Sequence, residues 1–76
     1  MNKERRKRIE ELIDRISELK EEVEAITEEE QEYIDNFPEN LQGSERYSAA
    51  EDALEALEGA SGSLDEAIDS LTSATE

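Results

Sequence analysis

The sequence predicts an all-α fold, an antiparallel two-helix hairpin of the coiled-coil type. Two long segments carry apolar residues at alternating steps of three and four, the spacing that places them on one face of a helix. A segment containing Pro, Asn and Gly separates them, and the two patterns align when the chain folds back there. We expect one domain over residues 1–76, with helices at about 2–36 and 44–74 and a turn at 37–43.

The first helix carries a heptad seam interrupted once, at Glu30. The seam consists of Ile9, Leu12, Ile16, Leu19, Val23, Ile26 and Tyr33. Ile13 and Ile34 widen this apolar stripe on one flank, which indicates contact with more than one neighbouring helix. Phe37 precedes Pro38 and is therefore disfavoured in helical dihedrals, so the helix should end near Asn36.

The second helix should begin after Ser44, whose hydroxyl is a good N-cap. Its seam consists of Tyr47, Ala50, Leu54, Leu57, Ser61, Leu64, Ile68, Leu71 and Thr75. The alternation passes through Gly59 and Gly62 without a slip, which favours one continuous helix although each glycine costs about 1 kcal/mol relative to Ala. Two short helices separated at 59–62 are the alternative.

Folding back near residue 40 should place seam residues opposite each other when their numbers sum to 80, in pairs that run from 33/47 to 9/71. Because a hairpin of this size leaves much of its apolar stripe uncovered, we expect a homodimer that closes as a four-helix bundle. The expected oligomer seam is Ile13, Ile16, Leu19, Val23, Leu54, Leu57, Leu64 and Ile68. Ala53, Ala60, Ala67 and Ala74 either form a second packing face or simply favour helix.

The chain has no Cys and no His, so it lacks a thiolate nucleophile, the usual general base and the residues of closed zinc sites. We therefore expect no enzymatic activity, no cofactor and no metal. No apolar run is long enough to cross a bilayer and no signal peptide is recognisable, so the expected location is the cytoplasm.

The formal charge of −15 is unevenly distributed, with +2 on residues 1–20 and −17 on the remainder. Such a surface repels nucleic acid and membranes and attracts basic proteins. One row of acids, spanning ~21 Å at 1.5 Å per residue, approaches the charge spacing of a DNA strand. This acidic row, the expected partner-binding site, is Glu21, Glu24, Glu28, Glu32 and Asp35. The alternative is a solvated face that serves only solubility.

The aromatic residues Tyr33, Phe37 and Tyr47 gather near the turn, where they and Leu41 should form either a plug or an exposed docking surface. The basic segment 3–8 should lie beside the C-terminal end of the second helix and offset its negative dipole end. A short contact with nucleic acid or another anion is the alternative for this segment.

The turn sequence NFPENLQGSERY at Asn36 to Tyr47, with the start MNKERRKRIEELI and the acidic, Ala-rich second helix, resembles small acidic coiled-coil proteins of phages and mobile elements of Gram-positive bacteria. By analogy, this resemblance implies a phage-type inhibitor that blocks a host nucleic-acid-binding or defence protein, with anti-CRISPR or anti-restriction action as its sharpest form. A structural homo-oligomerisation module is the main alternative. A weaker one is a sponge for a small anionic signalling molecule, held by Arg5, Arg6, Arg8 or Arg46.

Overall fold

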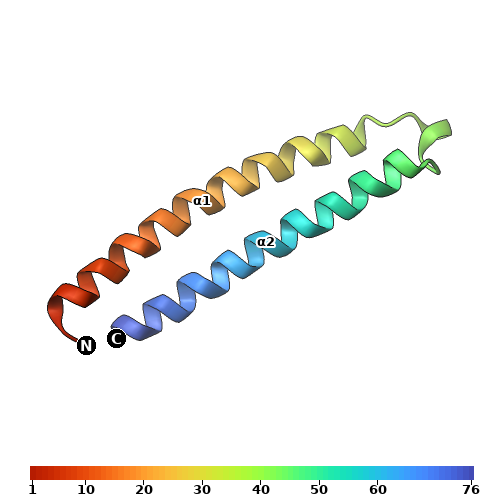
Figure 1. Cartoon of the computed structure of the whole chain (residues 1–76). Helices are drawn as coiled ribbons and strands as arrows, with labels where there is room; N and C mark the ends of the chain where they lie inside the picture. Colours follow the sequence, from red (N-terminus) through yellow and green to blue (C-terminus); the bar gives the residue numbers. More distant parts are fainter.

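The computed structural model describes all 76 residues and is an antiparallel helical hairpin, as the sequence predicts. Helix α1 spans Lys3–Asp35, the short 3-10 helix η1 spans Glu39–Leu41, and helix α2 spans Glu45–Thr75. The two long helices run side by side and both termini lie at the same end (Figure 1). The hairpin measures 60 × 15 × 13 Å. Neither helix has a segment long and apolar enough to cross a membrane.

Side-chain caps fix the start of both helices. The side chain of Asn2 accepts a 2.7 Å hydrogen bond from the backbone N–H of Arg5, and Ser44 Oγ accepts one of 3.3 Å from Tyr47, as predicted for Ser44. Helix α1 ends one residue before Asn36, just ahead of the Phe37 and Pro38 pair. Helix α2 runs through residues 59–62 without a break, so the alternative of two short helices is not what the structure has.

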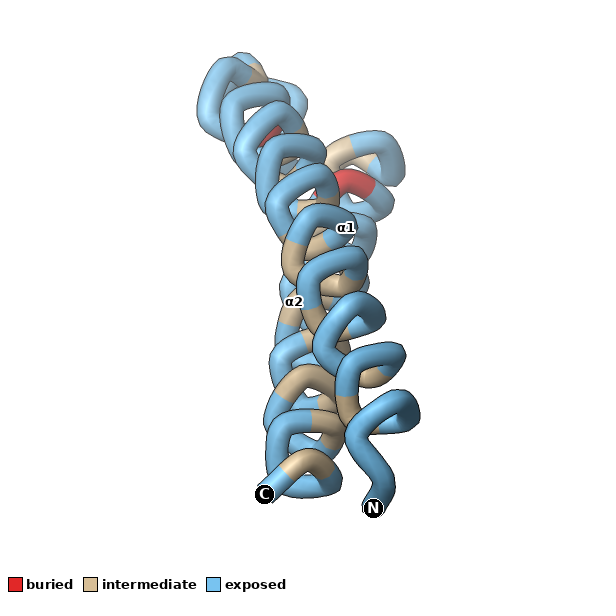
Figure 2. Tube along the Cα trace, turned by 90° about the vertical axis from the view of Figure 1, so that its left-hand side faces the viewer, coloured by how far each residue is buried: buried red, intermediate tan, exposed pale blue.

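The inner face of α2 is the predicted seam. Ala50 is only 5% exposed, and the remaining seam residues, from Tyr47 to Thr75, are half-buried. The inner face of α1 consists of half-buried residues and of Ile34, which is 8% exposed, and the half-buried Phe37 continues it into the turn. The half-buried residues are Arg6, Ile9, Ile13, Ile16, Lys20, Val23, Thr27 and Glu30. Figure 2 shows these residues as a stripe of tan and red between the helices, whose outer surfaces are exposed.

Helix α1 is rotated about its own axis, so that one of the two heptad columns facing α2 differs from the prediction. Its column Leu12, Leu19, Ile26 and Tyr33 is 42%, 53%, 51% and 43% exposed, so the prediction that these residues face α2 was wrong. The column that begins at Arg6 and continues at Ile13 and Lys20 takes the inner place. One physical reason is that the polar members of this column find partners on α2. Arg6 Nε donates a 3.0 Å hydrogen bond to the backbone oxygen of Thr75, and Lys20 lies 2.6 Å from Asp65.

The direction and approximate register of the hairpin agree with the prediction. The polar and aromatic contacts between the helices join Tyr33 to Arg46, Arg6 to Thr75, Phe37 to Tyr47 and Lys20 to Asp65. The residue numbers of these pairs sum to between 79 and 85, whereas the aligned seams predict 80. The register is therefore close to the prediction, and the main difference is the rotation of α1.

Candidate interaction surfaces

The acidic row of Glu21, Glu24, Glu28, Glu32 and Asp35 is exposed along its whole length. Glu24 lies 3.3 Å from Lys20 Nζ, and Asp35 accepts a 2.9 Å hydrogen bond from Gln31. The other three carboxylates have no Lys or Arg within 4.0 Å, because the only ion pairs in the protein are those that Lys20 makes with Glu24 and Asp65. The row therefore presents nearly uncompensated negative charge to solvent.

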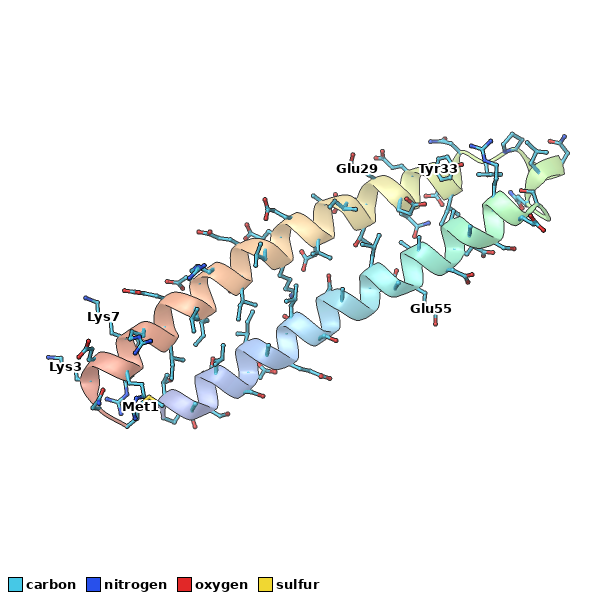
Figure 3. The ribbon with its side chains drawn as sticks, viewed as in Figure 1. Met1, Lys3, Lys7, Glu29, Tyr33 and Glu55 are labelled. Carbon is cyan, nitrogen blue, oxygen red and sulfur yellow. The ribbon has the colours of Figure 1, made fainter.

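Acidic side chains also project from α2. Glu29 on α1 and Glu55 on α2 point to opposite outer sides of the hairpin (Figure 3). Glu51, Glu55 and Glu58 on α2 are all exposed, and none of them has an ion-pair partner. The hairpin thus carries negative charge on both long edges, and α2 offers an internal control for the acidic row.

Lys20 joins the two helices and was not singled out from the sequence. Its ammonium donates to Asp65 on α2 and to Glu24 on its own helix, and these two hydrogen bonds, that to Asp65 first, raise the pKa of Lys20 above its ordinary value. A sequence signal existed, because Ile16 and Leu64 were predicted to face each other. Lys20 lies one helical turn after Ile16, and Asp65 directly follows Leu64. This pairing puts the two charges near each other along the hairpin, but only the rotation of α1 turns Lys20 toward α2.

An apolar face lies on the other side of the hairpin. The Tyr33 hydroxyl accepts a 3.3 Å hydrogen bond from Arg46 Nη2, which fixes the position of one end of this face. Steps of seven residues from this pair, in opposite chain directions, bring Ile26 beside Ala53, then Leu19 beside Ala60. We call Leu12, Leu19, Ile26 and Tyr33 the outer apolar column, and Ala53, Ala60, Ala67 and Ala74 the alanine row.

The predicted oligomer seam is divided by the rotation of α1. Its members Ile13, Ile16, Val23, Leu54, Leu57, Leu64 and Ile68 are half-buried residues of the inner faces. Leu19 alone is exposed, at 53%, and belongs to the outer apolar column. A surface available to another chain therefore includes Leu19 and the three other residues of that column.

The aromatic residues meet at the turn as predicted. The ring of Phe37 makes edge contacts with Tyr33 and Tyr47, both with ring centroids 5.3 Å apart and with interplanar angles of 88° and 71°. Phe37 and Tyr47 are half-buried, whereas Tyr33 and Leu41 are 43% and 46% exposed. A surface hollow here is lined by Tyr33, Asn36, Phe37, Pro38, Leu41 and Arg46. The cluster therefore closes the turn end and also leaves part of its apolar surface open.

The basic segment lies beside the C-terminal end of α2, as predicted. Arg6 donates to the backbone oxygen of Thr75, one of the carbonyls that have no partner within the helix. Lys3, Arg6, Lys7 and Glu10 line a shallow hollow at this end. No group of three His, Cys, Asp or Glu side chains is placed to hold a metal ion. The contact of Arg6 supports a structural role for the segment.

Comparison of the chain with models of known protein families, with curated proteins and with solved structures finds no match. The two surfaces that remain as candidates are the acidic row and the apolar face. Their interpretation depends on their own geometry and charge.

Proposed function

We propose that this hairpin is a non-enzymatic binding protein whose acidic row engages a basic surface on a nucleic-acid-binding protein and thereby inhibits or sequesters it. The observation that supports this function best is the exposed, nearly unpaired row of carboxylates on a continuous 33-residue helix. A regular helix holds its charges at fixed spacing before binding, so little conformational entropy is lost on association.

The length of the row is suited to a groove that normally holds nucleic acid. Glu21 and Asp35 are 14 residues apart, which corresponds to ~21 Å along the helix. A DNA strand presents about six phosphates over that axial length. Attraction between opposite charges acts over about 8 Å at physiological salt, so the acids on both edges of the hairpin would speed the encounter with a basic partner.

The resemblance to small acidic phage proteins makes a host defence nuclease, of the CRISPR or restriction type, the sharpest version of this proposal. Such enzymes bind DNA through basic channels or grooves. An acidic protein that occupies such a channel prevents DNA from entering without needing any catalytic residue.

The test is competition between the hairpin and fluorescent duplex DNA for a panel of purified CRISPR and restriction nucleases. We expect inhibition of at least one nuclease, with an affinity that falls more than tenfold between 50 and 200 mM salt, as in other interfaces dominated by charge. Reversing Glu24, Glu28 and Glu32 to Lys should abolish the competition. The matched control reverses Glu51, Glu55 and Glu58 on α2 to Lys, which changes the net charge equally and should weaken binding by only a fewfold.

Two outcomes would contradict this assignment. Equal losses in the two triple variants would mean that only the overall charge matters and that the acidic row is not the site. Affinity that does not change with salt would mean that the carboxylates do not carry the interaction.

A second function, a structural module that assembles with itself, is favoured by one specific observation. The outer apolar column exposes between 42% and 53% of four large side chains at heptad spacing, whereas isolated exposed apolar residues are ordinary on protein surfaces. Charge reversal in the acidic row should leave this function intact. The two functions are compatible, since the acidic row and the outer apolar column occupy different positions around α1.

A further inference from the structure

The hairpin exposes more surface than a compact protein of its size. Its accessible surface is 5834 Å² for a mass of 8.6 kDa. A compact monomer of that mass exposes about 4,700 Å², so the excess is on the order of 1,100 Å². Only Ile34 and Ala50 are buried, and no side chain is fully buried. The single chain has therefore closed only part of its hydrophobic core.

The exposed large apolar side chains of the two long helices all lie on one side of the hairpin. The apolar face contains the outer apolar column and the alanine row, and beside that row α2 carries Ala49, Ala56, Ser63 and Ser70, all exposed and uncharged. The opposite side carries the ion pairs of Lys20 with Asp65 and Glu24. On this side Arg46, at the turn end, is the only charged residue that α2 contributes, so a flat neighbour can be accommodated with little loss of exposed charge from α2.

We propose that a second copy of this chain packs on the apolar face with its hairpin pointing in the opposite direction, so that Leu19 and Ala60 lie on the two-fold axis. The inference rests on the self-association function above and is independent of the acidic row. The resulting assembly is a four-helix bundle. In it, α1 uses the two columns of its inner face against α2 and the outer apolar column against α1 of the second copy.

The charges beside the outer apolar column favour a second copy of the chain, packed antiparallel, as the neighbour on the apolar face. The column of α1 that borders the outer apolar column consists of Arg8, Arg15, Glu22 and Glu29, basic toward one end and acidic toward the other. When two α1 helices cross antiparallel at Leu19, Arg15 approaches Glu22 of the second copy and Arg8 approaches Glu29. Both pairs occur twice in the dimer because the two-fold axis repeats them.

The overall distribution of charge favours the same orientation. The turn half of the hairpin, residues 21–59, holds fourteen acids and one Arg and so carries −13, while the terminal half, residues 1–20 and 60–76, carries −2. Antiparallel stacking places each strongly negative half beside a nearly neutral one. The other face-to-face arrangement, with both turns at one end and α1 lying over α2 of the second copy, would bring the two −13 halves together.

Shape is also compatible with this arrangement. In this dimer Leu12 meets Ile26 of the second copy, and Leu19 meets Leu19 of the second copy. Each Leu19 lines a surface hollow on its own chain, together with Arg15, Glu18, Glu21 and Glu22. On α2, Ala60 meets itself and Ala53 meets Ala67, so two rows of small residues let the helices approach closely. A face of 60 by 15 Å has a footprint on the order of 900 Å² per copy, comparable with the ~800 Å² per partner of standard stable interfaces.

The absence of native cysteine allows a direct test by disulfide cross-linking. A disulfide requires Cα atoms within about 7 Å of each other. Leu19→Cys should form a covalent dimer on mild oxidation at micromolar concentration, because the axis places it beside its own copy. Leu12→Cys is the matched control from the same column. It lies ~10.5 Å from the axis along the helix, so its two copies are ~21 Å apart and should remain monomeric on a non-reducing gel. The double variant Leu12→Cys and Ile26→Cys should cross-link.

Light scattering on the unlinked protein completes the test. The measured molar mass of the native chain should be twice that of the monomer. Leu19→Glu should lower the molar mass to that of the monomer and retain the helical circular dichroism signal. Leu41→Glu makes the same change at a site that is 46% exposed in the turn, and it should remain dimeric.

Three results would overturn the proposal. The first is a monomeric native chain. The second is equal cross-linking of Leu12→Cys and Leu19→Cys, which would indicate random collisions. The third is efficient cross-linking of Leu19→Cys only when it is mixed with Ala60→Cys, which would indicate the orientation with both turns at one end. None of these results bears on the binding of nucleases by the acidic row.

Discussion

The two helices of the hairpin divide their apolar residues in different ways. Helix α2 has its large apolar side chains in two adjacent heptad columns, and the alanine row lies next to one of these columns. Helix α1 has large apolar residues in three adjacent columns, those of Leu12, Ile16 and Ile13. Since one neighbouring helix covers only about two columns, α2 can satisfy its pattern within the hairpin and α1 cannot.

The column of α1 that stays exposed is more apolar than one of the two that are covered. The covered column includes Lys20 and Thr27, whereas the outer apolar column has no charged residue between Leu12 and Tyr33. The inner polar groups are satisfied, Lys20 by its carboxylates and Thr27 by a 2.8 Å hydrogen bond to the backbone oxygen of Val23. The difference between the helices indicates that α1 is shaped for two neighbours, of which the single chain supplies one.

The sharpest way to break this comparison is to place the same charge in a covered and in an uncovered column. Leu57→Asp puts a carboxylate between the helices and should lower the free energy of unfolding by about 3 kcal/mol or more, because an apolar contact is lost and a charge is desolvated. Leu19→Asp places the same group on the outer apolar column of α1, at a residue that is 53% exposed. Within a single hairpin it should be nearly neutral.

Far-UV circular dichroism at low protein concentration measures both variants. Leu57→Asp should lose most of its helical signal at 25 °C, since a domain of this size has only a few kcal/mol of stability to lose. Leu19→Asp should keep its helical signal. Similar melting curves for the two would mean that the rotation of α1 described above is wrong.

The same contrast explains what the sequence could and could not predict. The hairpin, the cap at Ser44 and the inner face of α2 follow from local signals and from one unambiguous pair of columns. The rotation of α1 does not follow, because Leu12, Ile13 and Ile16 mark three candidate columns and only the neighbours decide between them. Exposure of the acidic row was predictable, since no apolar column passes through it. The link from Lys20 to Asp65 required that rotation as well as the register.

A smaller effect concerns the glycines of α2. A Cβ placed on Gly59 or Gly62 would meet no atom within 4 Å, and neither residue has positive φ. Each change to Ala should raise the free energy of unfolding by about 0.5–1 kcal/mol, because Ala is the better helix former and restricts the unfolded chain. Thermal melting should show an increase of several degrees for each. Gly43→Ala, in the turn and equally free of neighbours, should change the melting temperature much less. A decrease for Gly59→Ala or Gly62→Ala would mean that α2 is not continuous there.

The smallest effect should come from the ion pairs on the polar side of the hairpin. Because hydrogen bonds to Asp65 and Glu24 raise the pKa of Lys20 above its ordinary value of 10.5, its stabilising contribution should be fully present below that pH and be lost as pH rises through the raised pKa. The melting temperature of the native chain should therefore fall between pH 10 and 12 by more than that of Lys20→Met. The variant changes no other ionisable residue, so a difference between the two pH profiles can be assigned to Lys20. Parallel pH profiles would show that the bridge adds nothing, which is the common outcome for exposed pairs. A steeper fall in the native chain would show that this bridge stabilises the hairpin in which Lys20 lies on the inner face of α1.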